Sequence, residues 1–101
     1  MPLTNFEFGE EEIDGTIIIK AYDSKQLVVA FITREDIDDC IAAPYTPQKR
    51  RAWVEQNLDA IGAVISAKYD RGETNPYNRF GSTMQRIDIT ATDLGNLRTD
   101  N

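Results

Sequence analysis

Chemistry in proteins usually depends on a few residue types, and this chain of 101 residues is poor in them. It contains no histidine, which is the commonest general base and the commonest metal ligand. The only cysteine, Cys40, therefore has no imidazole to activate its thiol, and the serines have no partner for a catalytic triad. A short helix with Ile37, Cys40 and Ile41 on one side predicts that Cys40 is an ordinary buried residue.

Carboxylates are the remaining candidates for acid–base chemistry. The pairs Glu35/Asp39 and Asp36/Asp39 have helical spacing, but they belong to exposed positions of a short helix, so we interpret them as solvated surface. The run of residues 10–12 is acidic, yet a hard cation needs converging oxygens in a shaped loop. The segment GETNPYNRFG lacks the spacing and the lysine-plus-hydroxyl ending of a phosphate-binding loop. We therefore expect no enzyme activity, no cofactor and no metal site.

Two segments have the composition of binding surfaces. Lys49, Arg50 and Arg51 form a basic cluster near the start of a predicted helix, although alone it is too small to bind nucleic acid well. The segment 75–81 is predicted to be an irregular loop, and tyrosine and arginine are enriched at the centres of protein interfaces. Its candidate partner-binding residues are Tyr77, Arg79 and Phe80. The alternative is that the two aromatic rings fold back over the sheet edge or the end of a helix.

The net charge of −6 disfavours direct binding to nucleic acid. Residues 1–43 carry ten acidic and three basic residues, whereas residues 44–101 carry seven acidic and eight basic residues. This asymmetry either forms an acidic face for a basic partner or serves solubility alone. The first twelve residues do not resemble a signal peptide, no window approaches the roughly 18 apolar residues of a membrane span, and a single cysteine fits a reducing compartment. We therefore expect a cytoplasmic protein.

Residues 47–71 are predicted to form one long amphipathic helix that organises the core. Apolar residues recur at spacings of three and four, which places them on one helical face; they include Val54, Leu58, Ile61, Ile65 and Tyr69. Thr46 is predicted to cap the start of the helix and Gly72 its end. Gly62 lies in the middle, where it is either a tolerated weak point or the site of close packing by another element.

The remaining pattern predicts a single small α+β domain. Residues 16–22 and 27–32 are rich in β-branched residues and flank a short turn, so they predict an antiparallel hairpin. A short helix capped by Thr33 follows, and residues 84–91 predict a last strand. We predict the order β-β-α-α-β, with an antiparallel sheet packed on the long helix. Residues 1–14 are expected to be irregular or to add a short edge strand, and residues 95–101 to fray.

Four stretches of this pattern resemble a known family: the hairpin of residues 16–32, TREDI, AKYDRGE and ITATDL. Together they are similar to a family of small uncharacterised bacterial proteins, domain of unknown function fourteen eighty-eight. The resemblance covers roughly residues 15–94 and implies a β-β-α-α-β fold. The segment 74–83 is longer than the family pattern. The family carries no established activity, so the resemblance implies no site residues.

Three functions follow as hypotheses. The first is a small acidic protein-interaction module without catalytic activity, which we expect to form a homodimer. The second is an acidic inhibitor or nucleic-acid mimic, encoded by a mobile element against a host enzyme, in which residues 10–14 and 35–39 replace phosphates. The third is a weak carboxylate-based enzyme or ligand-binding protein, which requires an enclosed pocket holding two acids with raised pKa values.

Overall fold

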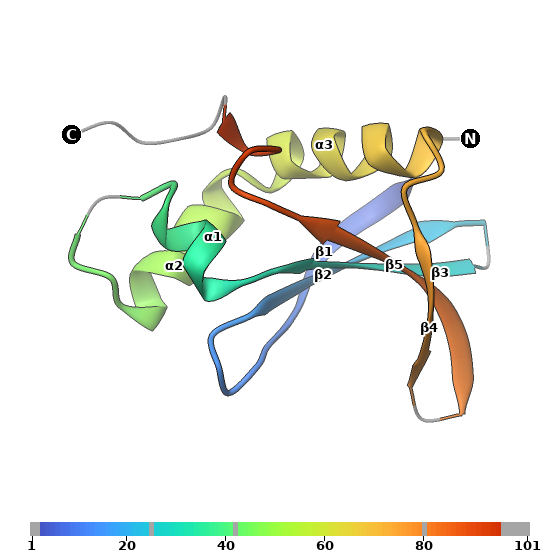
Figure 1. The fold of residues 1–101 in the computed structure, drawn as a ribbon, viewed down its shortest axis with the longest axis horizontal. Helices are drawn as coiled ribbons and strands as arrows, with labels where there is room; N and C mark the ends of the chain where they lie inside the picture. Colours follow the sequence, from blue (N-terminus) through green and yellow to red (C-terminus); the bar gives the residue numbers. More distant parts are fainter. Residues whose placement is uncertain (1–2, 25, 42, 80, 96–101) are drawn as a thin grey trace.

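The computed structural model of the protein describes residues 3–24, 26–41, 43–79 and 81–95. It confirms the predicted α+β class, with one five-stranded sheet and three helices that all lie on the same side of it (Figure 1). In chain order the elements are β1 (Thr4–Glu11), β2 (Ile17–Asp23), β3 (Gln26–Ile32), α1 (Arg34–Asp38), α2 (Pro47–Gln56), α3 (Leu58–Asp70), β4 (Asn75–Arg79) and β5 (Ser82–Ile89).

The strands are ordered β1-β2-β3-β5-β4, so the strongly apolar β3 is central, as its composition predicts. The predicted hairpin of β2 and β3 is confirmed, with Ile17 opposite Ile32 and Asp23 opposite Gln26. The prediction of a wholly antiparallel sheet is wrong, because β5 pairs parallel to β3. After the helices the chain runs along the sheet edge as β4 and turns back as β5, which enters between β4 and β3.

Two segments form strands: residues 1–14 were expected to be irregular or to add a short edge strand, and residues 75–81 were expected to be an irregular loop. The N-terminal segment forms the edge strand β1, and both Phe6 and Phe8 pack against the core from it. The predicted loop of residues 75–81 is instead a hairpin, with Tyr77 opposite Met84. Pro76 is compatible with β4 because that strand lies at the edge, where outward N–H groups need no ladder partner. The order β-β-α-α-β is therefore incomplete by one strand at the start, one helix and one strand near the end.

The prediction of one long helix over residues 47–71 is also wrong, because this segment divides at Asn57 into α2 and α3. Asn57 has a φ of −110° and a ψ of 17°, outside helical geometry. Its side-chain Nδ2 donates to the carbonyl oxygen of Trp53 at 2.8 Å, so the amide competes with the helical hydrogen-bond pattern. The predicted helix ends are confirmed: Thr46 Oγ1 accepts from Lys49 N at 3.1 Å, and Gly72 has a positive φ of 77°.

The main core lies between the sheet and the helices. Cys40 is fully buried, as predicted, and Leu94 and the α3 residues Ile61 and Ile65 are buried as well. Leu58 is only partly buried, contrary to expectation, because it lies at the start of α3, directly after the break at Asn57. Residues 96–101, which include most of the segment expected to fray, lie outside the described residues. Among the described helices, none is both long and apolar enough to cross a bilayer.

Candidate functional site

The three residues of the predicted basic cluster, Lys49, Arg50 and Arg51, make separate contacts in the folded protein. Arg50 is buried and holds Asp38 through two hydrogen bonds, Nε to Oδ1 at 2.7 Å and NH2 to Oδ2 at 3.2 Å. Lys49 Nζ donates to the carbonyl oxygen of Ala43 at 3.2 Å. The guanidinium carbon of Arg51 lies 4.8 Å from the centre of the Phe8 ring. The three side chains therefore serve internal contacts and do not make a common basic surface.

Of the candidate partner-binding residues in the segment 75–81, the structure describes the side chain of Tyr77 alone. Tyr77 is half-buried on β4, and its ring packs edge-on against Phe31 with the ring centres 5.3 Å apart. Arg79 ends β4, and its side chain lies outside the described residues, as does the whole of Phe80. The arginine that does stack on these rings is Arg86 of β5, whose guanidinium carbon lies 4.0 Å from the Phe31 ring centre. The sequence could have indicated Arg86, because the alternation of apolar and polar residues along β5 places it on the outward side of the strand.

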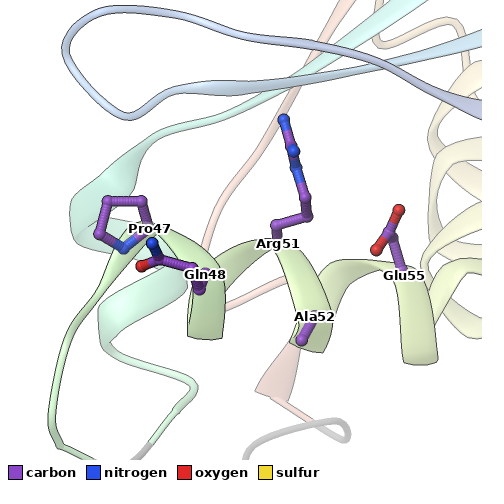
Figure 2. A pocket seen from close by; sticks show the side chains of 5 residues that line it. All are labelled: Pro47, Gln48, Arg51, Ala52 and Glu55. Carbon is purple, nitrogen blue, oxygen red and sulfur yellow. The ribbon is translucent and has the colours of Figure 1, made fainter.

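A more distinctive surface lies at the start of α2, and we call it the Pro47 end. It has two shallow hollows that share Pro47. One, of about 310 Å³, lies along α2 (Figure 2) and is lined by Pro47, Gln48, Arg51, Ala52 and Glu55. The other, of about 320 Å³, lies between α2 and the turn after β1 and is lined by Glu12, Ile13, Asp14, Gly15, Arg34, Pro47 and Arg50. Figure 2 shows Arg51 rising from α2 towards the strands, while Glu55 marks the far end of the first hollow.

The turn of residues 12–15 presents Ile13 in a defined conformation. Glu12 N donates to the carbonyl oxygen of Thr16 at 2.7 Å, and Gly15 N donates to that of Glu12 at 2.9 Å. Asp14 Oδ1 accepts from Thr16 N at 2.9 Å, and this backbone hydrogen bond lowers the pKa of the Asp14 carboxyl. Gly15 supplies the positive φ of 93° that the turn requires. Ile13, between the two acids, is fully exposed to solvent.

Exposed apolar side chains are concentrated at this end of the molecule. Within the described part of the chain, Ile13 and Tyr45 are the two large hydrophobic residues that are exposed. Tyr45 lies two residues before Pro47, and its carbonyl oxygen accepts from Arg50 NH2 at 3.3 Å. Ile13 lines the second hollow, and Tyr45 is linked to it through its carbonyl oxygen, which accepts from the lining residue Arg50.

The charge around the second hollow is negative. Arg50 is neutralised by Asp38, and the exposed Arg34 makes a 3.5 Å ion pair with Glu35. Glu12 and Asp14 remain on the rim as exposed carboxylates. The acidic turn also lies against α1, because a Cβ placed at Gly15 would lie 3.0 Å from the Cβ of Arg34. The two acidic segments of the sequence thus meet at the Pro47 end.

The acids on α1 have more structural contacts than solvated surface would have. Asp36 Oδ1 accepts from Ala91 N at 3.1 Å, which joins α1 to the turn after β5. The carboxyl groups with shifted pKa values are those of Asp14, Glu73 and Asp93, and all three are lowered. Among the residues that the structure describes, no group of carboxylate and thiol side chains could hold a metal ion.

Comparisons with known proteins leave the family open. No family model matches the chain, and neither the curated proteins nor the solved structures contain a match to it. The resemblance to the small bacterial family therefore stays a prediction, and the function has to be argued from the surface of this chain.

Proposed function

We propose that the protein is a small acidic protein-interaction module that has no catalytic activity, works in the cytoplasm, and docks a partner protein at the Pro47 end. The observation that carries the proposal is the full exposure of Ile13, a large hydrophobic residue in the lining of the second hollow, with the exposed Tyr45 linked to Arg50 of the same lining. Single exposed apolar residues are common on protein surfaces. An exposed isoleucine that lines a hollow with a polar rim is more typical of an interaction site.

The turn that carries Ile13 favours binding because its conformation is already fixed. Backbone hydrogen bonds and the Asp14 carboxylate hold residues 12–16, so little backbone freedom is lost when a partner covers the isoleucine. Burying an isoleucine side chain contributes about 1.5–3 kcal/mol. Ile13 contributes nothing comparable to the stability of the monomer, because its side chain is fully exposed there.

The chemistry of the rim identifies the kind of partner. Glu12 and Asp14 flank Ile13, while the nearby arginines have carboxylate partners of their own. A matching surface would therefore have an apolar pocket for Ile13 and basic side chains around it. Such charge complementarity speeds association and makes it dependent on salt.

The proposal is tested by capture from a bacterial lysate with the tagged protein, followed by titration of the purified partner. Ile13→Ser and Tyr45→Ala should each weaken binding roughly 5- to 30-fold, as expected of an interface residue worth about 1–2 kcal/mol. Ala63→Ser, at an exposed position of α3, is the matched control and should bind like the wild type. Unchanged affinity of both test variants for the captured partner would refute the docking site.

A second candidate is the acidic inhibitor or nucleic-acid mimic, since the acidic turn and α1 meet at the same end. In that case the carboxylates supply the affinity, so Glu12→Gln and Glu35→Gln should weaken binding to a basic enzyme more than Ile13→Ser does. Affinity should also fall steeply between about 50 and 200 mM salt. The carboxylate-based enzyme has less support, because the hollows are shallow and the three shifted carboxyl pKa values are lowered.

A further inference from the structure

The face of the sheet that points away from the helices has an apolar centre of its own. We call it the open sheet face. It comprises the buried residues Ile18, Val29, Phe31 and Met84, with Leu27 and Tyr77 partly buried beside them. On the opposite side, α3 packs against β1 and β5 (Figure 1), and the buried residues of α1 and α2 belong to the main core on that side. A solvated sheet face normally alternates with polar residues, whereas β3 is apolar on both of its faces.

The cover over this centre consists of side chains from the sheet itself. Only 2% to 9% of each of the four central residues is exposed. Arg86 lies across Phe31 at 4.0 Å and also lies 5.7 Å from the Tyr77 ring centre. The Arg86 side chain remains 36% exposed, and its NH2 group pairs with Asp88 Oδ1 at 2.9 Å. Tyr77, Arg86 and Asp88 thus form a surface rich in the residue types of interface centres, above a rigid apolar layer.

Among the described side chains of the open sheet face, opposite charges lie next to each other. Lys20 lies directly opposite Glu7 on the neighbouring strand, and Arg86 is paired with Asp88. The whole chain carries a net charge of −6, so two copies repel each other through most of their surfaces. The electrostatic repulsion between two copies is therefore smallest when they associate through a face on which positive and negative side chains are paired.

The size of the face is sufficient for a weak dimer. Five strands spaced about 4.8 Å apart, with five to seven residues at about 3.3 Å each, give roughly 500 Å² per copy. Two copies would then bury about 1,000 Å², the lower bound of specific protein interfaces. A dissociation constant in the micromolar range is the corresponding expectation.

We infer that the open sheet face binds a second copy of this chain in a two-fold symmetric dimer. In such an interface the same patch is used by both copies, so Arg86 of one copy lies against Asp88 of the other. The two sheets pack face to face at about 10 Å, so Tyr77, Arg86 and Asp88 of the two copies cover each other above apolar centres that are already shielded within each copy. The Pro47 end is a separate surface and stays free for a partner.

Charge exchange tests this dimer by sedimentation velocity at several hundred micromolar. The wild type should approach twice the monomer mass of 11.4 kDa. Arg86→Asp alone and Asp88→Arg alone place like charges across the interface, so each should weaken self-association at least tenfold. An equimolar mixture of these two variants should restore the dimer as a heterodimer, because opposite charges then face each other.

Controls separate this inference from the docking proposal. Arg34→Asp makes the same change in net charge at the other surface and should dimerise like the wild type, as should Ile13→Ser. Thermal melts of all variants show whether each one folds. A wild type that stays at 11.4 kDa, or a mixture of the two charge variants that stays monomeric, would overturn the dimer without bearing on partner binding at the Pro47 end.

Discussion

Gly62 of α3 lies directly beneath the aromatic ring of Phe6 on β1. A Cβ placed at position 62 would lie 3.1 Å from both Cγ and Cδ2 of the Phe6 ring. Glycine therefore lets the edge strand approach the helix, and the contact supplies part of the cover for the N-terminal strand. The position carries a helix-propensity cost of about 1 kcal/mol, which the close approach offsets.

Gly62→Ala is expected to destabilise the protein by about 0.5–2 kcal/mol. The alanine gains helix propensity, but its methyl group forces the Phe6 ring to move, and overpacking usually costs about 1–3 kcal/mol. Urea unfolding measures the net effect. In a Phe6→Leu background the obstacle is smaller, so the same substitution should become neutral or stabilising. A stabilising effect of Gly62→Ala in the wild-type background would contradict the close approach.

Arg50→Met should lower the free energy of unfolding by about 1–3 kcal/mol, because it leaves the Asp38 carboxylate and the Tyr45 carbonyl without their guanidinium donor. Arg50→Met combined with Asp38→Asn should cost less than the sum of the single variants, since the remaining partner no longer carries a charge. The exposed neighbour Gln48 provides the control, as Gln48→Ala should change stability by no more than about 0.5 kcal/mol. Additive single effects would argue against a coupled pair.

Asp93 should make stability depend on acid pH. Partial burial raises the pKa of this carboxyl, but hydrogen bonds from Lys68 Nζ at 2.7 Å and from Thr90 outweigh the burial, and the net pKa is lowered. A lowered folded pKa contributes stability that is fully present above the ordinary value of 3.8 and is lost as the pH falls through the folded value.

Asp93→Asn should therefore cost about 1–2 kcal/mol at pH 7 and almost nothing near pH 2. Denaturant melts at a series of pH values compare the variant with the wild type. The difference between the two proteins should narrow between about pH 5 and pH 2. A difference that stays constant across this range would show that the Asp93 charge does not contribute.

The two apolar residues at the start and middle of α3 should differ in their contribution to stability. Ile61 is completely buried, so Ile61→Ala should cost about 2–5 kcal/mol through the cavity that it leaves. Leu58 is only partly buried beside Asn57, so Leu58→Ala should cost less, about 1–2 kcal/mol. Equal losses in urea unfolding would indicate that α2 and α3 form the continuous helix that the sequence pattern predicts.

Cys40 should behave as a buried thiol. Its side chain is inaccessible in the main core, so a disulfide reagent such as Ellman's should modify it slowly in the native protein and rapidly in denaturing urea. The ratio of the two rates reports the opening of the core. Rapid modification under native conditions would contradict the placement of α1 against the core.

Local features of this protein were determined by the sequence itself. The β-branched runs around a short turn produce the β2–β3 hairpin, and Thr33, Thr46 and Gly72 cap their helices as predicted. These features depend on residues within a few positions of one another, so propensity and side-chain capping are sufficient to identify them. The same holds for the burial of Ile61, which follows from helical periodicity.

Other features depend on contacts between distant segments, which local patterns do not encode. β1 is a strand because it pairs with β2 and packs Phe6 against Gly62, and β4 is a strand despite Pro76 because it pairs at the sheet edge with β5. The helix divides at Asn57, where the side-chain amide and the backbone N–H of Asn57 both donate to the carbonyl oxygen of Trp53. The Pro47 end arises only when tertiary packing brings the turn of Ile13 beside α2, because Ile13 and Pro47, which line the same hollow, come from separate parts of the chain.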